Sequence, residues 1–397
     1  MLQAKLNTGK LVTLYGRTKS EIEWLRKHRQ FYCPTCNSKV MIKAGTKSIP
    51  HFSHYSTADC PSSEGGEGEY HEKGKLALFQ WLQNQGLQVS LEEYIPQIQQ
   101  RPDIYLQYKE KKIAIEYQCA RIPIHTIQQR TNGYIKVGIM PVWILGVNHL
   151  KRKSKNVIQV DQFIQQFIHV YPRKRLSVIY FFDPHTNHLI HATDLFPIKH
   201  SRVIANLTIK KLHTIPFLQL FNLTRANPLC MLEEWKKAKF KFRMHQPRRV
   251  YGKERAWYQW LYLKGTHWEK LPSSIYLPVS SPYLLDTEPW NWQSRICLEI
   301  IEPLAIGDSF SLNNCYNLLR KSITRQTFPL INSSNDPILE YLHLLSLLQI
   351  LRPTTPNKFI KCKQLVFHAT LEDALKGDEL LMEYLCKNFQ ANHEHDS

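Results

Sequence analysis

The spacing of apolar positions changes in a regular order between residues 70 and 146. Residues 70–85 repeat apolar side chains at helical spacing before a glycine, which predicts an amphipathic helix. Three short runs rich in β-branched and aromatic residues then predict strands, at residues 89–95, 101–106 and 113–118. A further helix is predicted from residue 123 to about residue 132, before a buried strand at residues 138–146. The predicted order is α-β-β-β-α-β, so we expect an α/β fold.

The pattern beyond residue 150 predicts two further regions. Residues 176–182 and 188–192 are apolar and flank a polar turn, which predicts a hairpin that extends or flanks the sheet. Residues 290–390 predict mainly helices, among them a strongly apolar helix at residues 338–351 that ends before Pro353. We therefore divide the chain into residues 1–62, 63–150, 151–230 and 231–397.

The amino-acid composition indicates which class of partner the protein binds. The chain has 397 residues and a formal net charge of +19. Such a basic excess favours a polyanionic partner, most simply nucleic acid. No run approaches the roughly 18 apolar residues of a membrane helix, and the N-terminus lacks the apolar core of a signal peptide. We therefore expect a cytoplasmic protein with no membrane partner, and we expect no small-molecule substrate.

The basic charge is concentrated in residues 236–255, where only Glu254 opposes it. Basic side chains bind phosphates, so this run predicts a DNA-binding segment. The residues expected to contact DNA are Lys236, Lys237, Lys239, Lys241, Arg243, Arg248 and Arg249. Exposed aromatic residues between Trp257 and Trp268 would suit single-stranded DNA, but their helical spacing favours burial in a core.

Three of the nine cysteines lie with two histidines near the N-terminus. Cys33 and Cys36 form a Cys-x-x-Cys knuckle, and His51, His54 and Cys60 follow. Zinc takes four nitrogen or sulfur ligands, so the sequence leaves open which four of these five bind it. A closed four-ligand site is structural, and it stabilises a unit that has little apolar core. We predict a small zinc-ribbon-like domain here.

Asp103 and Glu116 carry the candidate chemistry. Each stands in a predicted strand, and the polar stretch at residues 107–112 predicts a hairpin turn that brings the two carboxylates together. Converging carboxylates are unfavourable unless a cation neutralises them, and Mg²⁺ is the usual partner. Such an ion can hold a phosphodiester and activate water. The alternative for Asp103 is a turn-capping role after Pro102.

These motifs resemble the PD-(D/E)xK nuclease superfamily, and residues 1 to about 150 resemble the competence protein CoiA family. Besides the cysteine–histidine cluster, the resemblance rests on Glu69-Tyr70-His71 with Lys73, Arg101-Pro102-Asp103, Ile115-Glu116-Tyr117-Gln118-Cys119, Arg130 to Tyr134, and Val142 to Gly146. It implies a restriction-endonuclease-like core in a DNA-processing protein. It also implies a role in natural transformation, after single-stranded DNA has entered the cell and before or during its recombination into the chromosome.

One position departs from the superfamily pattern. Gln118 stands two residues after Glu116, where the superfamily has lysine, although CoiA-like relatives also tend to have glutamine there. Glutamine can orient a water or a phosphate, but it carries no charge and is no base. We expect Lys73 or His71, from the preceding helix, to supply the missing proton transfer or positive charge.

The expected roles follow from charge. Asp103 and Glu116 bind Mg²⁺ or Mn²⁺, and Gln118 positions the attacking water. Arg130 contacts phosphate, with the support of Tyr134. Two further acids, Glu69 and Glu93, are candidates for an additional carboxylate; the alternatives are a solvated helix start and an exposed strand position, with Glu92 pointing the other way.

Two functions fit these residues. The first is a Mg²⁺-dependent nuclease that acts on incoming single-stranded or branched DNA during recombination. The second is a DNA-binding accessory that does not cleave and that helps the recombinase machinery act on single-stranded DNA. Asp103, Glu116 and Glu69 favour the first, and Gln118 favours the second. A restriction-type defence nuclease fits the same motifs.

Overall fold

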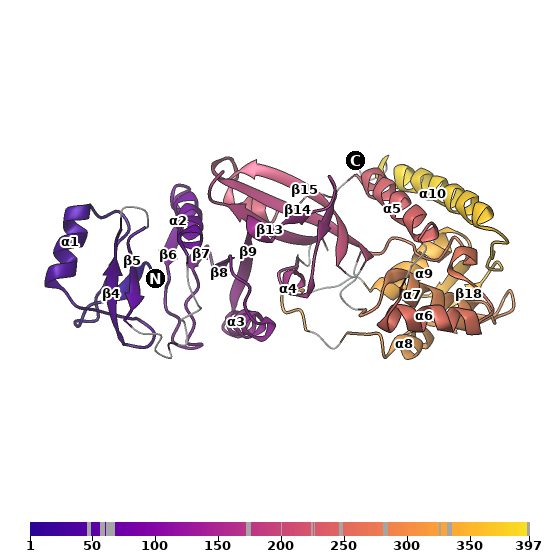
Figure 1. The fold of residues 1–397 in the computed structure, drawn as a ribbon, viewed down its shortest axis with the longest axis horizontal. Helices are drawn as coiled ribbons and strands as arrows, with labels where there is room; N and C mark the ends of the chain where they lie inside the picture. The colour runs from indigo at the N-terminus through magenta and orange to yellow at the C-terminus, as the bar shows by residue number, and fades with distance from the viewer. Residues whose placement is uncertain are drawn as a thin grey trace.

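The computed structural model describes residues 1–45, 49–55, 60, 68–171, 176–199, 201–223, 225, 227–245, 249–280, 285–324, 327–331 and 336–394. Three parts follow one another along the long axis of the molecule (Figure 1). The N-terminal part is a small sheet with a helix, the central part is built on a large sheet, and the C-terminal part is mainly helical.

The N-terminal part is an antiparallel sheet with the strand order β2-β1-β3-β4-β5. Its strands are β1 (Gln3–Lys5), β2 (Leu11–Thr13), β3 (Phe31–Tyr32), β4 (Lys39–Lys43) and β5 (His51–His54). Helix α1 (Lys19–His28), which the sequence analysis did not predict, begins at a capping box between Thr18 and Glu21. Its apolar face is short, since Ile22 and Leu25 are the residues that it buries.

The central part confirms the predicted order of elements. That order is α2 (Glu69–Gln83), β6 (Gln88–Leu91), β7 (Ile104–Tyr108), β8 (Lys111–Gln118), α3 (Ile124–Lys136) and β9 (Ile139–Gly146). Strands β6, β7 and β8 are antiparallel neighbours, and β9 runs parallel to β8. A parallel pair needs a crossover, and α3 supplies it.

Strand β8 is buried on both faces, which explains its continuous apolar run. Ile113, Ile115 and Tyr117 pack in the core that α2 covers. Because side chains alternate along a strand, Glu116 and Gln118 face the opposite side, where α3 lies. Glu116 is therefore an acidic residue in a strand that is buried on both faces.

The predicted hairpin at residues 176–192 is confirmed and extends the central sheet. Strand β13 (Ser177–Asp183) lies parallel to β9 and pairs with β14 (His188–Lys199), which pairs in turn with β15 (Arg202–Lys211). The smaller elements of this region are β10 (Lys151–Arg152), β11 (Val157–Gln159), α4 (Gln162–Gln165) and β12 (His169–Val170).

The C-terminal part contains the expected helices and also a small sheet. The helices are α5 (Pro228–Arg243), α6 (Gly252–Leu263), α7 (Pro289–Ile296), α8 (Leu312–Leu319), α9 (Pro337–Leu347) and α10 (Leu371–Glu394). The sheet has the strand order β16-β18-β17, formed by β16 (Ser309–Ser311), β18 (Lys358–Lys361) and β17 (Leu351–Thr355).

One predicted boundary in this part is wrong. The helix expected at residues 338–351 ends at Leu347, because Gln349 has a left-handed backbone with a φ of 58°. Pro353 lies inside β17. No helix in the described ranges combines the length and the apolarity that a bilayer crossing needs.

Candidate active site and metal cluster

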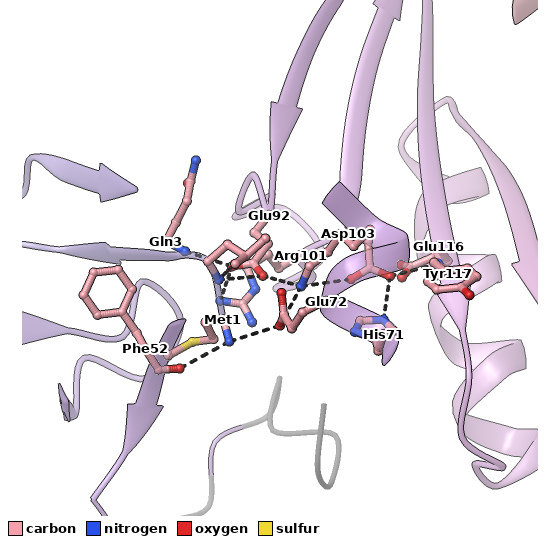
Figure 2. A network of polar contacts seen from close by, with 12 residues as sticks. Met1, Gln3, Phe52, His71, Glu72, Glu92, Arg101, Asp103, Glu116 and Tyr117 are labelled. Atoms are coloured by element: carbon pink, nitrogen blue, oxygen red, sulfur yellow. Dashed lines mark hydrogen bonds and ion pairs between the residues drawn. The ribbon is translucent and has the colours of Figure 1, made fainter. Parts of the chain in front are cut away.

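A cavity of about 530 Å³ lies where the ends of β7 and β8 approach α2 and α3. Asp103 and Glu116 both line it, together with His71, Gln118 and Arg130. Ile104 pairs with Ile115, and one further step in this register sets Asp103 opposite Glu116. Opposite residues of an antiparallel pair share a face of the sheet. The hairpin thus brings the two acids to one cavity (Figure 2).

Asp103 is held by groups on β8 and α2. Its Oδ2 accepts a hydrogen bond from the backbone N–H of Tyr117 at 2.9 Å. The Nε2 of His71 lies 3.3 Å from the same oxygen, and the ring of His71 stacks on that of Tyr117. Lys75 Nζ lies 3.8 Å from Oδ1. Asp103 is therefore fixed in position and already has positive charge close by.

Glu116 is bound from α3. Arg130 Nη2 lies 2.5 Å from its Oε1, and the hydroxyl of Tyr134 donates to the same oxygen. Burial, and then the charge of Glu116, hold the pKa of Tyr134 well above its usual value, so this hydroxyl stays protonated. Helix α3 runs past the predicted end at residue 132, which puts Arg130 and Tyr134 one turn apart on one helix. Arg130 was expected to contact a phosphate; in this structure its guanidinium pairs with the Glu116 carboxylate.

A buried charge network, which the sequence pattern did not predict, lies behind Asp103. Lys75, whose side chain is 0% exposed, lies 2.6 Å from Glu92 and 3.2 Å from Glu72. The Glu92 carboxylate also accepts the backbone N–H groups of Leu2 at 2.9 Å and Gln3 at 3.2 Å. Through Glu92 the network joins strand β1 of the N-terminal part to the candidate site, as Figure 2 shows.

Glu93, rather than Glu92, was the sequence candidate. Glu93 is half-buried and does not line the cavity. Glu92 has a φ of 50°, which breaks the strand alternation on which that choice depended. The sequence did contain a sign of the role of Lys75. Lys75 and Glu72 are charged residues, three positions apart, on the otherwise apolar buried face of α2.

The remaining candidates separate into two groups. His71 and Gln118 line the cavity, and the side-chain amide of Gln118 donates to the Ala120 carbonyl at 2.8 Å. Glu69 and Lys73 are exposed on the first turns of α2 and do not line it. Of the two side chains expected to replace the missing lysine, His71 is thus the one near Asp103.

The N-terminal cysteines meet in a compact cluster. The ligand atoms of Cys33, Cys36, His54 and Cys60 all lie within 4.8 Å of one another. His51 is left out, because it stands three residues before His54 on β5, so the two side chains face opposite sides of the strand, and His51 lines a different cavity with Lys43. Burial raises the pKa of Cys33 to about 11, so a bound cation would be needed to keep its thiolate. Three sulfurs and one imidazole nitrogen fit structural zinc.

Removing one ligand is expected to unfold this unit. His54→Ala should abolish stoichiometric zinc and expose the N-terminal part to proteolysis, because metal binding supplies much of the folding free energy of such units. Zinc content and limited proteolysis measure this. His51→Ala is the matched control and should keep the metal. Equal zinc content in the two variants would contradict the assignment.

Part of the predicted DNA-binding segment is instead structural. Lys239 and Arg243 are each 1% exposed and both pair with Asp378 on α10, the guanidinium Nε at 2.9 Å. Lys239 also donates to the carbonyls of Ser273 and Ile275. They follow buried Trp235 at positions that α5 turns inward. These two residues hold α5 against α10 and are not exposed to DNA, which corrects the prediction for them.

The rest of that segment lies at the surface where it is described. Lys236 is exposed and lies 2.9 Å from Glu379. Lys237, Lys241 and Arg249 are also exposed, and Arg248 lies outside the described residues.

Comparison with known proteins covers all three parts of the chain. Three family models match, described as the N-terminal domain (residues 14–63), the nuclease-like domain (residues 67–225) and the C-terminal domain (residues 231–375) of competence protein CoiA. A protein of Bacillus subtilis (strain 168) described as competence protein CoiA is 31% identical over 274 residues, which are 68% of this chain and 72% of that protein. No solved structure gives a significant match.

Proposed function

Because this chain belongs to the competence protein CoiA family, we propose that it processes DNA during natural transformation with a metal-dependent nuclease site. The observation that carries the proposal is the presence of Asp103 and Glu116, from neighbouring strands, in one cavity. The order α-β-β-β-α-β supports a restriction-endonuclease-like core. Single-stranded or branched DNA is the proposed substrate, and the recombinase machinery is the proposed partner in a cytoplasmic reaction.

Two carboxylates are enough for the proposed ion. Mg²⁺ keeps several waters and takes one or two carboxylates beside the phosphates of its substrate. Asp103 and Glu116 would hold Mg²⁺ or Mn²⁺, which would polarise the phosphodiester and lower the pKa of a bound water.

The surrounding side chains have separate tasks in this mechanism. His71, 3.3 Å from Asp103, can accept a proton from the attacking water. The buried amide of Gln118 orients that water or a phosphate oxygen. Arg130, which lines the cavity beside Glu116, would contact a phosphate oxygen of the bound DNA.

A specific observation favours the second function, binding without cleavage. Positive groups of the protein already accompany both acids, Arg130 beside Glu116 and Lys75 beside Asp103. In this alternative the chain grips DNA and assists the recombinase.

A panel of substrates separates these functions. The full chain is incubated with single-stranded, double-stranded and branched DNA of the same sequence, with Mg²⁺, Mn²⁺ or chelator. Metal-dependent cleavage of single-stranded or branched DNA is expected. Binding with no cleavage under any metal would establish the accessory function, and a sequence-specific cut in duplex DNA would point to a restriction-type enzyme.

A further inference from the structure

Another cavity, of about 670 Å³, lies between the extended sheet and the C-terminal part. One wall comes from β14, β15 and the loop before β11, and the other wall comes from α5 and α6. Figure 1 labels β14, β15, α5 and α6. None of its lining residues lines the cavity of Asp103 and Glu116. An occupant would therefore bridge two parts of the chain at a place apart from the candidate nuclease site.

The rim of this cavity is basic on both walls. Lys153, Lys199 and Arg202 come from the sheet side, and Lys237 and Lys241 come from α5. All five side chains are exposed. Two acids also line the cavity: Glu234, which lies 2.8 Å from Lys237, and Glu254. Exposed like charges on facing walls repel one another, so the arrangement suits an anion that lies between them.

The floor is aromatic. Phe242, Tyr258, Tyr276 and Trp290 all line the cavity; the first two are half-buried and the last two are buried. The Phe242 ring centroid is 5.4 Å from that of Trp290, and the Nζ of Lys199 lies 5.8 Å from the Trp290 centroid. Flat rings beside phosphate-binding cations are how proteins hold unpaired bases.

We propose that this cleft binds a short single-stranded segment of DNA. Its phosphates lie along Lys199, Arg202 and Lys241, and a base packs against the half-buried rings of Phe242 and Tyr258. An acidic peptide would use the rim but not the aromatic floor. The volume falls within the about 300–1,000 Å³ typical of pockets for small molecules, so the cleft is too small for a double helix and suits part of a single strand.

The test compares two variants with the same net charge. The triple variant Lys199→Gln, Arg202→Gln, Lys241→Gln removes three rim charges. The control Lys253→Gln, Lys264→Gln, Lys376→Gln removes three exposed charges elsewhere in the C-terminal part. Affinity of the full chain for a fluorescent oligothymidylate is measured by anisotropy at several salt concentrations. All six side chains are exposed, so thermal unfolding should be unchanged.

The rim variant should bind the strand about tenfold or more weakly than the control. Its salt slope should fall by about 2, because each phosphate of a single strand that the protein neutralises contributes about 0.7 to that slope. Tyr258→Ala should weaken binding at an unchanged salt slope. Equal affinities of the two triple variants would overturn the proposal. So would equal competition by polyglutamate or by duplex DNA. Binding is measured in chelator, which removes the ion of the proposed nuclease site, so a failure of the nuclease proposal is separable from a failure here.

Discussion

Lys75→Met should destabilise the protein by about 3–5 kcal/mol, the range for removing one partner of a buried ion pair. Lys75 is fully buried and is the cation nearest to Glu92, at 2.6 Å, with Glu72 at 3.2 Å and Asp103 at 3.8 Å. Its removal leaves these acids crowded in a region of low dielectric constant. Urea unfolding followed by circular dichroism measures the loss.

The chain offers a matched control for this variant. Lys73 lies two residues earlier on the same helix and is exposed, so Lys73→Met should change the free energy of unfolding by less than about 0.5 kcal/mol. Adding Glu92→Gln to Lys75→Met should recover part of the loss, because it removes the carboxylate that loses its nearest cation, while Arg101 remains at 3.7 Å. Equal effects of the two lysine variants would contradict the network.

Asp103→Asn should reduce metal-dependent cleavage by about 10²–10⁴-fold, because a bound cation contributes several kcal/mol to catalysis and a tenfold change is about 1.36 kcal/mol. The amide keeps the shape of the side chain and its acceptor for the Tyr117 N–H. Single-turnover cleavage at saturating protein isolates the chemical step, and DNA affinity should stay within a few-fold.

Glu69→Gln is the control for this prediction. Glu69 is an exposed acid two residues before His71 and does not line the cavity, so its loss should leave the rate almost unchanged. A full wild-type rate in Asp103→Asn would remove Asp103 from the catalytic site. A large loss in Glu69→Gln would show that this acid approaches the cavity when DNA is bound.

Periodicity predicted the elements of the central part because they are regular and buried. Both faces of strand β8 are buried, so the sequence shows a continuous apolar run, and Glu116 stands out as the acidic residue within it. Glu92 was passed over because its position depends on one left-handed backbone angle, which local composition does not indicate. Such angles are set by the surrounding tertiary contacts.

The basic run at residues 236–255 shows that the number of charges in a segment does not tell which of its side chains are buried. In the sequence, Lys239 and Arg243 look like their basic neighbours, although α5 turns these two inward toward Asp378. Asp378 lies far along the chain, so the sequence gives no sign of the pairing. The same limit applied to the five candidate zinc ligands, since the choice between His51 and His54 depends on which face of β5 is turned toward Cys33 and Cys36.

The most direct test of the nuclease account is metal binding at Asp103 and Glu116 without DNA. Mn²⁺ is titrated into the zinc-loaded full chain, and bound ion is followed by electron paramagnetic resonance. The account requires a saturable site that Mg²⁺ displaces and that disappears in the double variant Asp103→Asn, Glu116→Gln. Mn²⁺ binding that is the same in wild type and double variant, or no saturable binding in wild type, would contradict it.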